Sequence, residues 1–193
     1  TKFSYSRDIK YIPDTNRFFT SNNRQPLHND FAYYPYDISP DWILLMSLQE
    51  CEYGGITSIV NVKLLTTILE KYNKNLLDEI TDCVITYKYE DVKRGSIISK
   101  KKLLINDNII NWNYFQIKTE FNDEHVIKVK NNFYQFLEKV ITDGQIFTYK
   151  KIWNRGDATL SNDHLNLHQR SSFLGSRWLK DFTMKDKNLK LKI

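Results

Sequence analysis

Short segments of β character, separated by turn residues, outnumber the helical segments of this chain and constrain its fold more than any other feature. Only residues 61–80 and 124–144 carry apolar residues at helical spacing. Asn61 is a suitable N-cap for the first stretch, which restarts near Asn75, and Gly144 ends the second. The predicted strands include CVITYKYE, SIISKKKLLI, NIINWNYFQIK, QIFTYKKIW and SSFLGSRWLKDFTM. Strands grouped around helices predict a mainly β domain with flanking helices, a β-sandwich or a barrel-like jelly roll around a pocket.

Length and composition limit the class of protein. We expect a single domain over residues 1–193, because the chain is long enough for a sizeable core and shows no linker or internal repeat. No apolar run approaches the roughly 18 residues of a membrane-spanning helix, so no membrane partner is predicted. Cys51 and Cys83 form no C-x-x-C pair and predict free thiols, which favours a cytoplasmic location.

The basic charge raises the question of a nucleic-acid partner. The net charge is +5, with local clusters at Lys100–Lys102 and in residues 185–193. Lysine is spread along the whole chain, however, and no zinc-finger or RNP-type motif accompanies it. A solvated basic surface is therefore favoured, and a non-catalytic β-domain that binds nucleic acid or protein is the alternative class.

Two of the four histidines suggest a metal site. His28 and Asp30 lie two residues apart in QPLHNDFAYY. On a β-strand, residues i and i+2 point to the same face, so an imidazole and a carboxylate would lie side by side while Asn29 points away. This arrangement suits two ligands of one metal ion.

A third ligand has two candidates. His125 begins a predicted helix, whereas His164 and His168 share one face of an alternating segment, and their spacing does not choose between them. Two histidines and one carboxylate form the facial triad of non-heme Fe(II) oxygenases, which leaves adjacent positions open for an organic acid and O2. Arg177, nine residues past His168, suits the distal carboxylate of such an acid because its planar fork binds carboxylates bidentately.

Five short motifs together resemble one family, the TauD/TfdA and clavaminate-synthase-like Fe(II)/2-oxoglutarate-dependent oxygenases. They occur in the family order and span most of the chain: HND at 28–30, GGIT at 54–57, GD at 156–157, HQR at 168–170 and RWL at 177–179. The resemblance implies a double-stranded β-helix, the cupin-like jelly-roll barrel, with Fe(II), 2-oxoglutarate and O2 as cofactor and co-substrates. The implied reaction hydroxylates or desaturates a small molecule, such as an amino acid, a betaine or a natural-product intermediate, and releases succinate and CO2.

The resemblance also implies a role for each matching residue. His28, Asp30 and His168 would be the iron ligands. The hydroxyl of Thr57 would donate to a 2-oxoglutarate carboxylate, Arg177 would hold the distal carboxylate, and Arg170 would be a neighbouring support. A nucleic-acid demethylase with the same barrel is a further alternative.

The sequence departs from the family pattern in several places. Asn162 and Asp163 stand in the reverse of the usual order, and Gln169 replaces a glycine expected beside the metal. Only 27 residues precede His28, which predicts a domain shortened at its N-terminus and puts turnover in question more than metal binding. Arg24, near the predicted mouth, suits either an acidic substrate group or the protein surface. Substrate and oligomeric state are not readable from the sequence.

Overall fold

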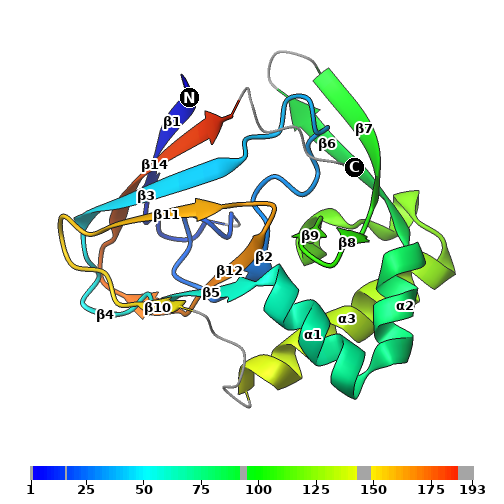
Figure 1. The fold of residues 1–193 in the computed structure, drawn as a ribbon. Coiled ribbons are helices and arrows are strands. Elements are labelled where there is room, and N and C mark those ends of the chain that lie inside the picture. The colour runs from blue at the N-terminus through cyan, green and yellow to red at the C-terminus, as the bar shows by residue number, and fades with distance from the viewer. Residues whose placement is uncertain (1, 16, 92–94, 143–148, 187–193) are drawn as a thin grey trace.

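Two four-stranded antiparallel sheets form the centre of the protein (Figure 1). The computed structural model describes residues 2–15, 17–91, 95–142 and 149–186. The first sheet has the order β1 (Lys2–Lys10), β14 (Trp178–Lys185), β3 (Trp42–Gln49), β11 (Ala158–Asn162). The second has the order β10 (Tyr149–Lys151), β5 (Thr57–Asn61), β12 (Asn166–Arg170), β2 (Gln25–His28). Neighbouring strands come from distant parts of the sequence, which confirms the predicted jelly-roll barrel, a double-stranded β-helix.

Three helices lie together beside the second sheet: α1 (Val62–Tyr72), α2 (Lys74–Asp82) and α3 (Glu124–Thr142). The Asn61 side chain accepts from the backbone N–H groups of Lys63 and Leu64, as predicted for an N-cap. Asn73 caps α2 through the N–H of Leu76, so the second helix begins just before the predicted position. Gly144, the predicted end of α3, lies outside the described residues.

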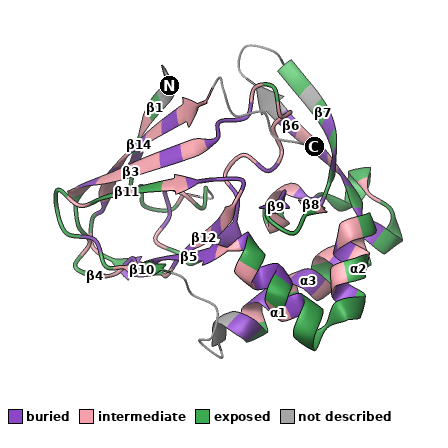
Figure 2. Cartoon of the chain, viewed as in Figure 1, coloured by how far each residue is buried: buried purple, intermediate pink, exposed green. Residues whose placement is uncertain are grey.

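The outer face of the second sheet packs against these helices. Leu27, Val60 and Leu167, one from each of three adjacent strands, join the apolar faces of the helices in one core, which also holds Trp112 and Phe133. Figure 2 shows the helices buried toward this core and exposed on their outer sides. Because side chains alternate along a strand, the neighbours of these three leucine and valine residues point to the opposite face, toward the first sheet.

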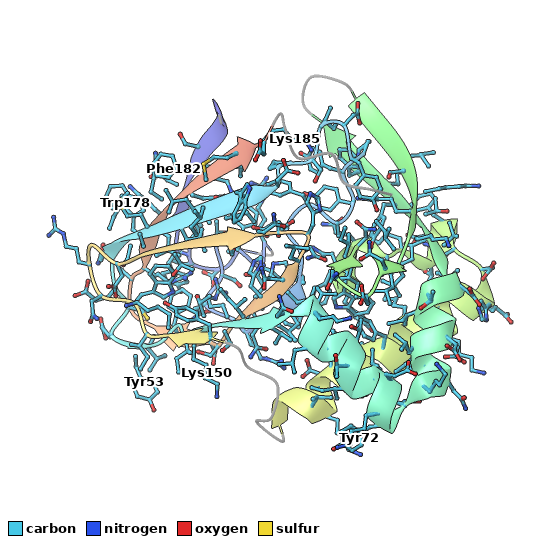
Figure 3. The ribbon with its side chains drawn as sticks, in the orientation of Figure 1. Tyr53, Tyr72, Lys150, Trp178, Phe182 and Lys185 are labelled. Carbon is cyan, nitrogen blue, oxygen red and sulfur yellow. The ribbon has the colours of Figure 1, made fainter. Side chains whose placement is uncertain are left out.

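The region between the two sheets holds a smaller apolar cluster. Ile9, Trp153 and Leu179 are buried there, with Phe19 and Leu45 packed against them. Figure 3 draws the side chains on the ribbon and labels Trp178 and Lys185, the first and last residues of β14.

The remaining strands form small two-stranded sheets: β6 (Val84–Asp91) with β7 (Gly95–Lys102), β8 (Leu104–Asn106) with β9 (Ile109–Ile110), and β4 (Tyr53–Gly54) with β13 (Phe173–Leu174). Short 3-10 turns follow at Tyr114–Gln116 and Thr119–Phe121.

Three predicted strands are divided or shorter than expected, and residues 145–148 of a fourth, QIFTYKKIW, lie outside the described residues. The segment SIISKKKLLI is divided at Leu103 into β7 and β8. The segment NIINWNYFQIK is a strand only at Ile109–Ile110, because residues 109–112 are buried on every side and Trp112 pairs its backbone with Asn29. The segment SSFLGSRWLKDFTM is divided by Gly175, whose φ of 79° breaks the extended backbone. Cys51 and Cys83 are free, as predicted. Within the described ranges, no helix is long and apolar enough to cross a membrane.

Candidate active site

The side chains of His28, Asp30 and His168 converge at one point. His28 and His168 are direct partners in the antiparallel pair of β2 and β12, and their ring centroids lie 4.3 Å apart. Asp30 Oδ1 lies 3.3 Å from His28 Nε2 and 3.8 Å from His168 Nε2. One donor atom from each residue lies within 4.8 Å of the others, so the three can hold a single metal ion.

The route to this convergence differs from the prediction. We expected one strand to carry both His28 and Asp30, but β2 ends at His28 and Asp30 opens the following turn. The Asp163 carboxylate fixes that turn, because its two oxygens accept from the backbone N–H groups of Asp30 and Phe31, each at 3.0 Å. Asp163, noted only as a departure from the family order, thus positions Asp30.

Asn29, between the two candidate ligands, anchors the same turn. Its side-chain oxygen accepts from Trp112 N–H at 2.9 Å, and its amide donates to the carbonyls of Asn166, at 2.9 Å, and Asp163. Asn29 points away from the metal position, as predicted, but its structural role was not foreseen. Asn29 is 1% exposed, and this burial could not be read from the sequence.

Asn29→Ala is expected to lower the free energy of unfolding by about 2–4 kcal/mol, because the lost amide leaves buried backbone groups without partners. Metal affinity should fall as well, since Asp30 loses its anchor. Urea unfolding and a Co(II) titration measure the two effects. Asn75→Ala, at an exposed position of α2, is the control. Unchanged stability in Asn29→Ala would contradict the anchoring role.

The electrostatics favour a cation among the three donors. His28 Nδ1 lies 2.8 Å from the Pro26 carbonyl, which suits a proton on Nδ1 and directs Nε2 toward Asp30. Burial lowers the pKa of His168 to about 4, and the nearby His28 adds to this effect, so His168 is neutral at pH 7. Burial raises the pKa of Asp30, but the imidazoles of His168 and His28 and the Arg7 guanidinium outweigh it and hold this pKa below its usual range.

His164 lies apart from this cluster. It is buried, and its Nε2 lies 3.3 Å from Asp41 Oδ1. Burial lowers the pKa of His164 to about 4 despite this carboxylate. The geometry therefore selects His168 from the two histidines that spacing left open.

The GGIT segment shapes the wall beside the cluster. Gly54 and Gly55 have φ of 78° and 64°, which favour glycine. Side chains there would also collide with neighbours: a Cβ at Gly54 would meet the Ser172 carbonyl, and one at Gly55 would lie 2.6 Å from Cys51 Sγ. The Thr57 hydroxyl accepts from Trp153 Nε1 at 2.7 Å, which leaves its proton free to donate elsewhere.

Arg177 is a buried cation that has no counter-ion among the described residues. It immediately precedes β14 rather than lying on it, it is only 7% exposed, and its guanidinium lies 5.7 Å from the Phe173 ring centroid. Its Nε has no hydrogen-bond partner, and it forms no ion pair within the described part of the chain. Burial lowers the pKa of Arg177 to about 9, so it stays charged at pH 7. A buried cation of this kind fits an incoming carboxylate.

Arg170, in contrast, is hydrogen-bonded to backbone carbonyls of the protein. Its Nη2 donates to the carbonyls of Phe18, Ser21 and Asn23 at 3.1, 2.9 and 2.5 Å. It therefore holds the loop between β1 and β2. Burial lowers the pKa of Arg170 to about 10. The supporting role beside the site that the resemblance implies for Arg170 stays a prediction.

Arg170→Met is expected to destabilise the protein by about 3–5 kcal/mol, because three loop carbonyls lose a charged donor inside the protein. Thermal or urea unfolding measures the change. Arg155→Met, at an exposed site, supplies the comparison. A loss no greater than that of Arg155→Met would show that the loop does not depend on Arg170.

A cavity of about 410 Å³ opens beside Asp30 and His28. Its aromatic lining residues are Phe18, Phe19, Phe31, Tyr33, Tyr114 and Phe115. Its cationic lining residues are Arg7, Arg17 and Lys118. The cavity thus combines an aromatic part of its wall with positive charge near Asp30 and His28.

Two residues flagged in the sequence lie away from this cavity. Arg24 pairs bidentately with Glu138 of α3, at 2.5 and 2.9 Å. Of the two alternatives for Arg24, a substrate contact or a surface arginine, this pairing favours the surface arginine. Gln169 was expected beside the metal. It alternates with His168 along β12 and instead accepts from Arg24 on the opposite face of the strand.

A double-stranded β-helix that brings two histidines and a carboxylate together is the framework of non-heme iron oxygenases. The chain belongs to one family of that class: it matches the family described as taurine catabolism dioxygenase TauD, TfdA over residues 6–183. No curated protein matches its sequence significantly.

Solved structures share the fold. Asparagine oxygenase, in complex with Fe(II), 2S,3S-3-hydroxyasparagine and succinate, has a TM-score of 0.70 at 13% identity, over 93% of this chain and 56% of the other. The non-heme iron oxygenase OrfP, in complex with Fe and alpha-ketoglutaric acid, has a TM-score of 0.62 at 16% identity, with the same coverage. OrfP with Fe, succinate and (3S)-hydroxy-L-Arg reaches 0.64 at 18% identity. The present chain spans little more than half the length of these proteins.

Proposed function

We propose that this protein is an Fe(II)- and 2-oxoglutarate-dependent oxygenase that hydroxylates or desaturates a small molecule. The observation that carries the proposal is the convergence of His28, Asp30 and His168, within 4.8 Å of one another, in a chain of the TauD, TfdA family. The donor set fits Fe(II), since two imidazoles and one carboxylate can occupy one face of an octahedron.

The chain also fits the co-substrate. Arg177 offers a charged guanidinium. Thr57 offers a hydroxyl proton from β5, the strand that pairs with β12 of His168. With Fe(II) and 2-oxoglutarate bound, O2 is reduced to an oxidant that removes hydrogen from carbon, and succinate and CO2 are released. The single charge of Asp30 offsets only half that of Fe(II), which favours a dianionic co-substrate. Aromatic walls around the cavity limit access of water.

For the substrate, we propose an amino acid or a small amino-acid derivative. Arg17 and Lys118 place positive charge at the cavity lining, where they suit a carboxylate. Asparagine oxygenase was solved with a hydroxylated asparagine and OrfP with a hydroxylated arginine. The cavity volume of about 410 Å³ accommodates a molecule of this size.

Succinate formation from added 2-oxoglutarate, in the presence of Fe(II), ascorbate and O2, tests the proposal. A panel of the free L-amino acids is compared with no added substrate, and products are identified by mass gain. We expect at least one amino acid to raise succinate formation and to gain 16 Da, or to lose 2 Da on desaturation. Succinate formation without any amino-acid dependence would contradict the substrate class, and no succinate with Fe(II) bound would contradict the oxygenase.

A further inference from the structure

A partly buried ion pair lies beside the candidate metal site. Arg7 of β1 and Asp181 of β14 are partners in the antiparallel register of these strands. Arg7 Nε donates to Asp181 Oδ2 at 2.7 Å, and the Asp181 side chain is completely buried. Stability alone does not explain this ion pair, because removing charges from water costs about as much free energy as their mutual attraction returns.

Arg7 also reaches the carboxylate of Asp30, which divides the roles of the two oxygens. Arg7 Nη2 lies 3.7 Å from Asp30 Oδ2. Asp30 Oδ1, in contrast, faces His28 Nε2 and His168 Nε2 at 3.3 and 3.8 Å. One oxygen is thus turned to the other donors and the second is turned to a cation.

We propose that Arg7, oriented by Asp181, is a positioning residue that keeps Asp30 a monodentate ligand. This inference rests on the proposed function. A carboxylate that bound through both oxygens would take a second coordination position and leave two open positions rather than three. An α-keto acid chelating through two oxygens needs two positions and O2 needs a third. Arg7 holds Oδ2 away from the metal and so preserves the third.

The rest of the Arg7 environment fits this role. Its guanidinium carbon lies 5.3 Å from the Phe19 ring centroid, which restricts the side chain from another direction. The Arg7 side chain is 29% exposed and lines the cavity. Its guanidinium therefore lies between Asp181 and the candidate metal site rather than on the outer surface. Groups that support a metal ligand in this way commonly tune the metal affinity.

The test compares metal binding by the intact protein and by R7M/D181L, which removes the pair without leaving an unpaired buried charge. Anaerobic titration with Co(II), followed by its visible ligand-field absorption, reports both affinity and coordination. The matched control is D8N/K180M. Asp8 and Lys180 are partners one position along the same two strands and form an exposed pair at 3.3 Å.

We expect R7M/D181L to bind Co(II) about 10–100-fold more weakly, with an altered absorption spectrum. D8N/K180M should match the wild type. R7K, which keeps a charge opposite Asp181, should show a smaller loss in the same direction, because one ammonium cannot bridge two carboxylates. R7K is the deciding variant if R7M/D181L does not fold.

A folded R7M/D181L or R7K with wild-type affinity and spectrum would overturn the positioning role while leaving the metal site itself intact. Failure of the wild type to bind Co(II) would overturn the proposed function, and this inference with it.

Discussion

His168→Ala is expected to remove specific Fe(II) binding and with it all substrate-dependent turnover. The remaining pair, His28 and Asp30, would hold a divalent ion through two donors only. Because loss of a group that merely supports a ligand weakens metal affinity by about 10–100-fold, loss of a ligand should weaken it by more than about 100-fold. Stability should change little in the metal-free protein, since His168 is neutral and partly exposed.

Anaerobic Fe(II) dialysis and thermal unfolding, with and without metal, measure this prediction. The wild type should gain thermal stability from Fe(II), whereas His168→Ala should gain none. His125→Ala changes an exposed histidine at the start of α3 and should behave as the wild type. Wild-type Fe(II) affinity in His168→Ala would exclude His168 as a ligand.

Arg177→Met is expected to weaken 2-oxoglutarate binding more than any other single change outside the metal ligands. Loss of a buried cation that pairs with a carboxylate costs about 2–5 kcal/mol, which corresponds to roughly a 30-fold to several-thousand-fold rise in Kd. The free protein, in contrast, should keep or gain stability, because the variant removes a desolvated charge that no described residue neutralises.

Two measurements check these predictions: the Kd of 2-oxoglutarate for the Fe(II)-loaded protein, and the free energy of unfolding of the apoprotein. Arg155→Met, at an exposed arginine, serves as the control for loss of charge. Unaltered 2-oxoglutarate affinity in Arg177→Met would assign the distal carboxylate to another residue. A large loss of stability would show that Arg177 supports the fold instead.

The sequence predicted the part of the site that depends on strand alternation. His168 lies on the inner face of β12 because Leu167 must face the helices, and alternation follows directly from this apolar pattern. The helices were predictable for the same reason, since Asn61 and the apolar stripe that follows it are local signals.

The sequence could not predict contacts that depend on long-range backbone geometry. In the sequence, Arg170 cannot be told from any other arginine. Its role follows only from the carbonyls of the β1–β2 loop, which lie around it in the structure. The ion pair of Arg7 and Asp181 joins residues 174 positions apart, and no local pattern links them. The strand predicted over 111–118 fails for the same reason, because Trp112 pairs with Asn29 rather than with a neighbouring strand.

The most direct test of the proposed site is an anaerobic titration of the protein with Fe(II) followed by 2-oxoglutarate. Chelation of the keto acid at Fe(II) gives a weak visible metal-to-ligand charge-transfer band. We predict a band that saturates at one equivalent of Fe(II), is absent in His168→Ala, and requires a much higher 2-oxoglutarate concentration in Arg177→Met. A folded wild-type protein that binds no Fe(II) and shows no band would contradict the assignment of His28, Asp30 and His168 as an iron site.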